Sequence, residues 1–386
     1  MTFRRHYEED HEAFRDSFRA FLRKEVVPHQ DEWRRNGIVS RDVWLAAGSH
    51  GYLLPWAEER YGGAGLSDFR FSQIELEELA YIGETGFYLP LHSALVGPYI
   101  GKLGTDRQKE RFLPRCISGE HVLAVAMTEQ GAGSDLAGMK TIAVDHGDHF
   151  VLNGAKTFIS NGLLADLVVV AAKTDPSRPR RVGLFVLERG MEGFERGTCL
   201  NKIGMKSQDT AELFFKDVRV PKENLLGNAT DGFRYLMEGL AEERLIAAVT
   251  NTGLARYAFD VTLEYIQQRQ AFGRPIGSFQ NSRFKMAQLS TEIELSQTYV
   301  DRCVDALNAG DLSGDHAARI KLYSSEMLGR VVDECLQLHG GYGYIEDYPI
   351  ARLYCDARIT RIFGGSSEIM KEIIAKSIGL IDEPGR

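Results

Sequence analysis

The feature of this 386-residue sequence that most constrains its fold is a change of hydrophobic period at two points along the chain. Before about residue 120, apolar residues such as Phe14, Phe18 and Leu22 recur every four positions, which is typical of amphipathic helices. From about residue 121 the pattern becomes short runs rich in β-branched residues, such as LVVVAAK and VGLFVLE. After residue 230 the helical period returns and continues to the end. The chain therefore combines helical and β regions in a fixed order.

These changes predict an α+β fold with three domains. We expect an N-terminal α-helical domain at residues 1–120, a middle antiparallel β domain at 121–230 and a C-terminal helical bundle at 231–386. The dipeptide Asn153-Gly154 predicts a hairpin turn inside the middle domain. Residues 232–269 predict one long helix at the start of the bundle.

Composition and charge exclude several classes of protein. A net charge of −8 argues against nucleic acid as the main partner, because phosphate binding needs a basic face. The five cysteines are scattered without a CxxC pair, which favours reduced thiols over disulfides or a metal site. The N-terminal stretch is charged throughout, and no window approaches the ~18 apolar residues of a membrane span. We expect a soluble, cytoplasmic protein with no bound metal and no membrane span.

Three glycine-containing segments are candidates for ligand binding. The segment AMTEQGAGSD at 126–135 could place backbone N–H groups and the hydroxyls of Thr128 and Ser134 against a ring or a phosphate, or it could be an ordinary solvent loop. It is not a Rossmann fingerprint, because Leu136 stands where the third glycine belongs. In YIQQRQAFGRPIGSFQ at 265–280, Arg269 could bind a phosphate or could belong to a helix connection.

The third segment, QLHGGYGY at 337–344, could bring backbone close to a cofactor or could be a turn between helices. Taken together and in this order, these segments resemble the acyl-CoA dehydrogenase family over nearly the whole chain. The matching stretches also include KTFISNG, IGMKSQDTAELFFKDVRVP, ERLIAA and DARITRIFGGSSEIMKEIIA. The ending GGSSEIMKEIIA is most similar to the long-chain branch, and the ERL triplet to the long-chain and isovaleryl branches.

The resemblance implies an FAD-dependent enzyme with a C-terminal four-helix bundle, assembled as a homotetramer or a dimer. It implies α,β-desaturation of an acyl-CoA thioester to trans-2-enoyl-CoA in fatty-acid β-oxidation or branched-chain catabolism. The electrons would pass to an electron-transfer flavoprotein, and medium or long acyl chains are expected. Two alternatives within the fold are a flavin-dependent oxidase or monooxygenase and a non-catalytic flavoprotein homologue.

The resemblance also implies roles for particular residues. FAD would be bound by Met127, Thr128, Ser134, Phe158, Ile159, Ser160, Arg269, Phe272, Gln280, Gln337, Gly340, Gly341, Ser366 and Glu368. Of these, the residues from 269 to 341 would serve the FAD of a neighbouring subunit. The substrate would contact Ser134, Phe233, Arg244, Phe363 and Gly365.

The catalytic base is the point at which the sequence departs from the family pattern. Gly364 occupies the usual place of the catalytic glutamate, although its backbone N–H can still bind the thioester oxygen. Glu243 interrupts an apolar helical stripe, whereas Glu242 is turned about 100° away. A structural ion pair would also explain Glu243. In the long-chain and isovaleryl branches, however, the base precedes Arg-Leu, so the resemblance implies Glu243 as the base.

Overall fold

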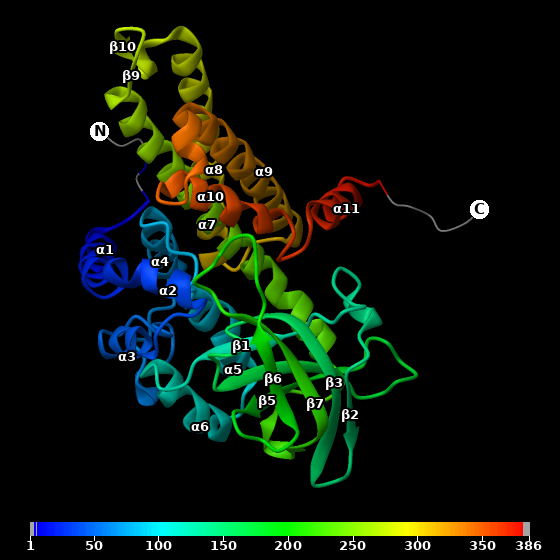
Figure 1. Ribbon diagram of the computed structural model, residues 1–386. Helices are drawn as coiled ribbons and strands as arrows, with labels where there is room; N and C mark the ends of the chain where they lie inside the picture. The colour runs from blue at the N-terminus through cyan, green and yellow to red at the C-terminus, as the bar shows by residue number, and fades with distance from the viewer. Residues whose placement is uncertain (1–3, 5, 381–386) are drawn as a thin grey trace.

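The computed structural model describes residue 4 and residues 6–380, and its helices and strands follow the order helical, β, helical (Figure 1). Phe18, Leu22 and Val26 are fully or almost fully buried, so the stripe that predicts the first helix faces the core. Thr105 caps the last helix of this region through its hydroxyl and the side chain of Gln108. The N-terminal helices are α1 (Glu9–Phe21), α2 (Gln30–Asn36), α3 (Arg41–Ser49), α4 (Phe69–Tyr81), α5 (Gly97–Leu103) and α6 (Asp106–Ile117).

The middle of the chain forms a mixed sheet with the strand order β6-β7-β3-β2-β4-β5-β8. Most neighbours are antiparallel, as predicted, but β1 pairs with β4 in parallel, and β2 has one parallel pair with β4. The sequence runs HVLAVAM, FVLNGAKTFI, LVVVAAK, VGLFVLE and AELFFKDVRV correspond to β1, β3, β4, β5 and β7, whereas β2, β6 and β8 were not predicted. The strands are β1 (Leu123–Ala126), β2 (Ile142–Asp145), β3 (His149–Ser160), β4 (Leu167–Lys173), β5 (Val182–Glu188), β6 (Phe194–Cys199), β7 (Thr210–Pro221) and β8 (Leu225–Leu226).

The hairpin predicted at Asn153-Gly154 is wrong, because both residues lie inside β3. The pairing of β3 with β7 shifts register between Leu152 and Gly154. A Cβ on Gly154 would lie 2.5 Å from the Thr141 hydroxyl oxygen, so glycine is needed here for close approach of two chains. The turn between β2 and β3 instead contains Gly147, at φ 95°.

The C-terminal helices form a bundle around α7 and α9, and α7 runs from the sheet to the tip of the molecule (Figure 1). A small two-stranded hairpin of β9 (Gln270–Ala271) and β10 (Arg274–Pro275) forms that tip. None of the helices in the described part of the chain is long and apolar enough to cross a membrane. The helices are α7 (Gly232–Gln268), α8 (Gln280–Asn308), α9 (Gly314–His339), α10 (Pro349–Ala357) and α11 (Ser367–Ser377).

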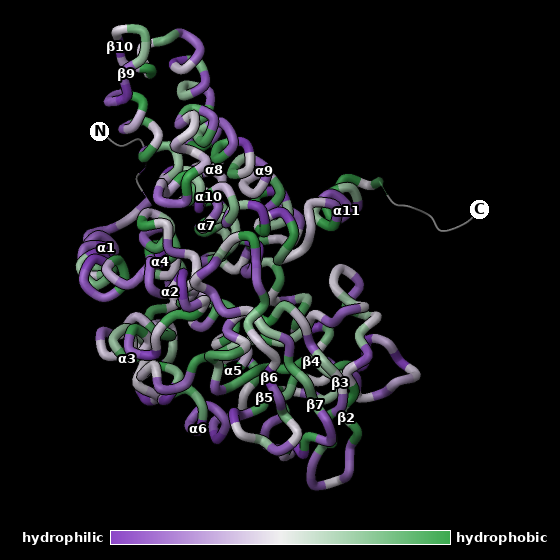
Figure 2. The backbone as a smooth tube through the Cα atoms, in the orientation of Figure 1, coloured by the Kyte–Doolittle hydropathy of each residue, from purple (hydrophilic) through white to green (hydrophobic). Residues whose placement is uncertain are grey.

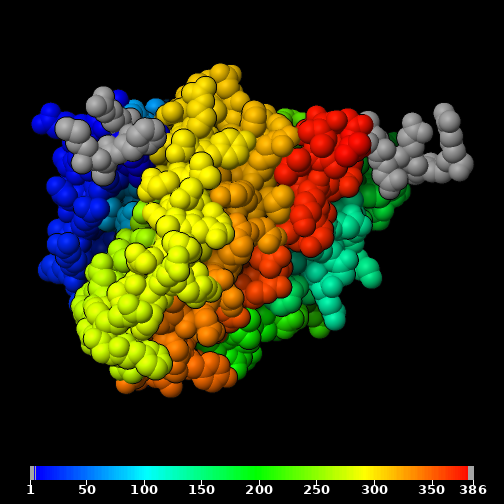
Figure 3. Space-filling model, turned by 90° about the horizontal axis from the view of Figure 1, so that it is seen from above, coloured from blue at the N-terminus to red at the C-terminus, as the bar shows by residue number. Residues whose placement is uncertain are grey.

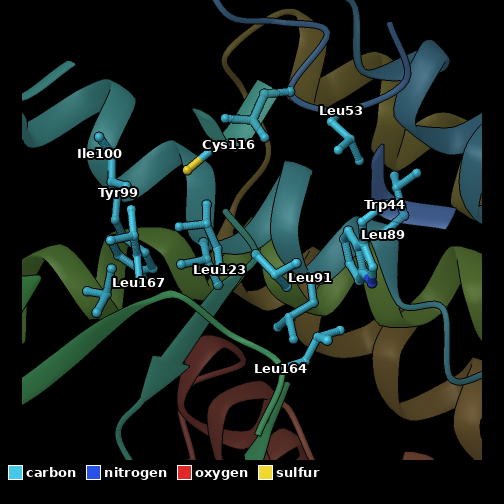
Figure 4. Packing of buried hydrophobic residues seen from close by; sticks show 14 of the residues in the cluster. Trp44, Leu53, Leu89, Leu91, Tyr99, Ile100, Cys116, Leu123, Leu164 and Leu167 are labelled. Carbon is cyan, nitrogen blue, oxygen red and sulfur yellow. The ribbon is translucent and has the colours of Figure 1, made fainter. Parts of the chain in front are cut away.

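One hydrophobic cluster joins the N-terminal helices to the sheet. It includes Trp44 of α3, Tyr99 of α5, Cys116 of α6 and Leu167 of β4, all buried (Figure 4). The outer helices α1 and α6 carry many hydrophilic residues, whereas apolar residues concentrate along the strands (Figure 2). Because this cluster includes residues of all six N-terminal helices and of the sheet, it fixes α5 relative to the middle of the chain.

Glu75 of α4 is a buried acid in this region. It is 1% exposed, and neither carboxyl oxygen has a hydrogen-bond partner among the described residues. Burial raises the pKa of Glu75 well above its usual value. The folded state therefore retains a proton that the unfolded chain releases, so this group makes the protein less stable as pH rises above about 4.3.

We expect Glu75→Met to stabilise the protein by about 1–3 kcal/mol at pH 8, because it removes a buried polar group without partners at similar volume. The gain in stability should be smaller at pH 5. At that pH the unfolded chain gains less free energy from releasing the proton that folded Glu75 retains. Thermal unfolding at several pH values measures both effects. The control is Glu110→Met, on the exposed surface of α6. A gain that is the same at pH 5 and pH 8 would contradict the protonation argument.

Candidate active site

Glu243 lies on α7 beside a cavity of about 120 Å³ between α5 and α7. We call this space the α5–α7 cavity; Leu95, Pro98, Tyr99, Gly239, Glu242 and Glu243 are among its lining residues. The Tyr99 hydroxyl donates a hydrogen bond of 3.1 Å to Oε1 of Glu243. Burial raises the pKa of Glu243 to about 7, although the Tyr99 hydrogen bond and the Arg244 charge both lower it. A carboxylate with this pKa can accept a proton near neutral pH.

Glu242 lines the same cavity, although the sequence placed it on a solvated face. Its carboxylate lies 3.1 Å from the Lys102 ammonium, and its side chain is 22% exposed. No lysine, arginine or histidine in the described part of the chain forms a salt bridge with Glu243. The two neighbouring acids therefore differ in their partners: the charge of Glu242 is compensated, whereas Glu243 has a neutral hydrogen-bond donor.

Gly364 and Gly365 form a turn that contacts a buried lysine of α9. Both glycines have positive φ, 61° and 92°, which favours glycine at these positions. The Lys321 ammonium of α9 donates to the Gly365 carbonyl oxygen. Burial and the neighbouring Arg244 charge lower the pKa of Lys321 to about 8. Arg244 is 7% exposed and follows Glu243 directly on α7.

The predicted substrate residues are dispersed around this region. Phe363 borders a second cavity with Leu76, Leu79, Tyr88, Thr250 and Leu254, which we call the apolar cavity. Tyr88 lines this cavity; burial raises its pKa to about 12, and the Glu243 charge adds to this shift. Phe233 is half-buried at the start of α7, where the Arg180 guanidinium lies 5.7 Å from its ring centre.

The sheet brings together part of the predicted flavin site. The backbone N–H of Thr157 donates to the Thr128 carbonyl oxygen at 2.9 Å, so the segment after β1 lies beside the end of β3. Met127 and Ser160 are half-buried. Ile159 is 2% exposed and packs in the core of the sheet, so its side chain is not available to a flavin.

The exposure and the backbone conformation of Phe158 indicate whether this surface fits a flavin. Its ring is 67% exposed at the end of a strand, and its φ of 59° is uncommon for a residue other than glycine. An aromatic ring held in a strained conformation and left uncovered suits stacking against a planar ligand. The nearby loop with the exposed Ser134 leaves open space at Gly131 and Gly133, so backbone N–H groups are accessible to phosphate. These residues fit the flavin of the predicted site.

Six of the other predicted cofactor residues form a separate group at the far end of α7 (Figures 1 and 3). Arg269, Gln337, Gly340 and Gly341 line one cavity of about 510 Å³. Phe272 is 95% exposed in the β9–β10 hairpin, and Gln280 is the first residue of α8. Within one chain, this group does not join the residues of the sheet. Ser366 caps α11, and Glu368 is exposed in its first turn.

Several residues around the site were not predicted from the sequence. Tyr99, Lys102 and Lys321 contact the predicted site residues only through tertiary structure. Lys156 was also missed, although a lysine between apolar residues in a strand is a signal of a buried charge. Its ammonium donates to the Met127 carbonyl oxygen at 2.9 Å and to Glu129 at 2.8 Å. The described residues contain no cluster of potential metal ligands, and all five cysteines lie among them unpaired.

Comparisons with known proteins agree with this arrangement. Family models for the N-terminal, middle and C-terminal domains of acyl-CoA dehydrogenases match residues 8–120, 124–218 and 230–379. The chain is 45% identical over 378 residues to the mitochondrial long-chain specific acyl-CoA dehydrogenase of Mus musculus, covering 97% of this chain and 88% of that protein.

Two solved structures extend the comparison. An acyl-CoA dehydrogenase from Geobacillus kaustophilus has a TM-score of 0.96 and 46% identity, covering 97% of this chain and 100% of that one. A glutaryl-CoA dehydrogenase from Mycobacterium smegmatis, in complex with FADH2, has a TM-score of 0.92 and 25% identity, covering 99% and 97%. The predicted fold class and enzyme class are confirmed, and the family relation implies a flavin cofactor. The chain belongs to the acyl-CoA dehydrogenase family.

Proposed function

We propose that this enzyme uses FAD to desaturate an acyl-CoA thioester between Cα and Cβ, with Glu243 as the base. The observation that carries the proposal is a half-buried glutamate of pKa about 7 beside the α5–α7 cavity. Its neighbour Arg244 lies near Lys321, and Lys321 binds the turn at Gly364 and Gly365. The base would therefore come from α7, and the potential oxyanion site from the turn before α11.

In the proposed reaction, the backbone N–H of Gly364 donates to the thioester oxygen and stabilises the charge that develops on it. Glu243 accepts the proton from Cα, and burial raises its basicity for this step. Lys321 holds the Gly365 carbonyl and so fixes the orientation of the turn. When FAD is bound, it supplies the acceptor for the hydride that leaves Cβ. The products would be a trans-2-enoyl-CoA, a protonated Glu243 and the acceptor reduced by two electrons.

Reduction of the bound flavin under anaerobic conditions tests the proposal. Acyl-CoAs with four to sixteen carbons are added to the purified enzyme, and flavin bleaching is followed by absorbance. We expect bleaching, and faster bleaching with medium or long chains than with butyryl-CoA. This order is supported by the ending GGSSEIMKEIIA, which resembles the long-chain branch, and by the 45% identity to a long-chain specific acyl-CoA dehydrogenase. Absence of bleaching with every chain length would favour a non-catalytic homologue, and reduction that needs NAD(P)H would favour a monooxygenase.

Several wider assignments belong to the same proposal. The electrons pass to an electron-transfer flavoprotein, and the pathway is fatty-acid or branched-chain acyl catabolism. The enzyme is a homotetramer or a dimer, with domains at residues 1–120, 121–230 and 231–386. The cytoplasmic location remains a prediction from the five unpaired cysteines, since the relative in Mus musculus is mitochondrial. Light scattering tests the assembly: a monomer that retains its flavin would contradict it.

Arg269→Ala should weaken FAD retention while the fold stays intact. Arg269 is exposed at the end of α7. In the proposed assembly, its guanidinium binds a phosphate of the neighbouring subunit's FAD. Loss of one charge-assisted hydrogen bond costs about 1.5–3 kcal/mol, so the dissociation constant should rise roughly tenfold to a hundredfold. Flavin titration of the apoprotein measures it. The control is Arg283→Ala, another exposed arginine near the same end of the bundle. Equal losses of FAD affinity in Arg269→Ala and Arg283→Ala would contradict a specific role for Arg269.

A further inference from the structure

We propose that Tyr99 is a positioning residue, whose hydroxyl holds the Glu243 carboxylate in the orientation that accepts the substrate's α-proton. This inference rests on the proposed role of Glu243 as the base. The hydroxyl donates to Oε1 of Glu243 at 3.1 Å. Tyr99 is 5% exposed and its ring is fixed among Ile100, Leu123 and Leu167 (Figure 4). The donor is therefore held by the hydrophobic core rather than by exposed residues of the cavity.

Gly239 gives independent support for this contact. It lies one helical turn before Glu243 in the interior of α7, where glycine weakens a helix. A Cβ at residue 239 would lie 2.9 Å from the Tyr99 hydroxyl oxygen and 3.8 Å from Oε1 of Glu243. Any side chain at this position would push the hydroxyl away from the carboxylate. The absence of a side chain thus provides the space that the hydrogen bond occupies.

The other charged groups around Glu243 do not replace this donor. On α7, Glu238 and Glu242 line the same cavity, and Arg244 is the adjacent residue. On α5, the Lys102 ammonium pairs with Glu242. Tyr88 approaches from the segment before α5, and Lys321 of α9 lies near Arg244. Within the described chain, Tyr99 is the side chain that forms a hydrogen bond with the Glu243 carboxylate.

The hydrogen bond has a measurable consequence for the base. A donor favours the charged carboxylate over the neutral acid, so Tyr99 lowers the pKa of Glu243 from the higher value that burial alone would give. Without the hydroxyl, a larger fraction of Glu243 is protonated near neutral pH and cannot accept a proton. The rate of flavin reduction should then require a higher pH.

The test compares Tyr99→Phe with the wild-type enzyme in single-turnover flavin reduction from pH 5.5 to 9.5. We expect the midpoint of the pH–rate profile to move up by about one pH unit. The rate should therefore fall about tenfold at pH 6 and stay within about threefold at pH 9. The matched control is Tyr52→Phe, which removes a buried hydroxyl from the same hydrophobic cluster, where it contacts Ser17. Its midpoint should not move.

A second variant and a second measurement separate this inference from the proposed function. Gly239→Ala should favour the helix but displace the hydroxyl, so its midpoint should move in the same direction as that of Tyr99→Phe. Infrared difference titration of the Glu243 carboxyl, assigned with Glu243→Gln, reports its protonation without any substrate. If acyl-CoA reduces no flavin, the proposed function fails while the titration still tests Tyr99. An unchanged Glu243 midpoint in Tyr99→Phe overturns the inference.

Discussion

Glu243→Gln is expected to bind FAD and acyl-CoA normally but to reduce its flavin about 10²–10⁴-fold more slowly. Glutamine keeps the size of glutamate and can still accept the Tyr99 hydrogen bond through its carbonyl oxygen, so the cavity should keep its shape. It cannot accept the α-proton. Stopped-flow reduction under anaerobic conditions measures the rate, and equilibrium titration of flavin absorbance measures substrate binding.

Glu242→Gln is the matched control, since Glu242 lines the same cavity one residue away. It should remain within a few-fold of the wild-type rate, because the Glu242 carboxylate is paired with Lys102. The wild-type rate should rise with pH through about 7, where Glu243 loses its proton, and this midpoint should be absent in Glu243→Gln. A normal reduction rate in Glu243→Gln would show that another residue is the base.

The second large effect is expected for Lys156→Met, on the sheet. The Lys156 side chain is fully buried, and its ammonium lies 2.8 Å from the Glu129 carboxylate. Glu129 also accepts hydrogen bonds from the backbone N–H groups of Lys140 and Thr141. Removal of the ammonium leaves a buried carboxylate without its counter-ion, which costs about 3–5 kcal/mol. Thermal unfolding should show a large fall in Tm.

The same substitution should also lower flavin content, because Lys156 holds the Met127 carbonyl in the segment proposed to bind the flavin. The double variant Lys156→Met with Glu129→Gln should recover part of the stability, since the uncompensated charge is gone. Flavin absorbance after gel filtration measures the first effect, and a double-mutant cycle in Tm measures the second. A single variant with wild-type Tm and full flavin content would contradict both.

The long helices could be predicted from sequence because their periodic signal is local. The run at 232–269 agrees with α7 within one residue, since every turn repeats the same apolar spacing. The turn at Asn153-Gly154 could not be predicted correctly, because Gly154 is required by contact with Thr141 of another segment. The strand β6 was missed because FERGTC is mostly polar and half-exposed and gives no alternating pattern.

The candidate site also combines a residue that the sequence could identify with partners that it could not. Glu243 could be proposed from its position before Arg244 on an apolar stripe, and the structure adds the burial that raises its pKa. Its partner Tyr99 is 144 residues away in sequence and gives no local signal. Lys321 likewise meets Gly365 only after α9 and the segment before α11 fold against each other. Pairs of this kind depend on tertiary packing, so they cannot be identified from a single sequence.

The length of α7 has a consequence for how this enzyme can change during evolution. Arg269 directly follows the last residue of α7 and lies 26 residues after Glu243, a separation of ~39 Å at 1.5 Å per residue. Insertion of one residue between them would rotate one end by ~100° relative to the other and lengthen the spacing. In the proposed assembly, that change would misalign one subunit's base with its neighbour's cofactor site. Substitutions can accumulate along this span, but its residue count is constrained by the geometry of two subunits at once.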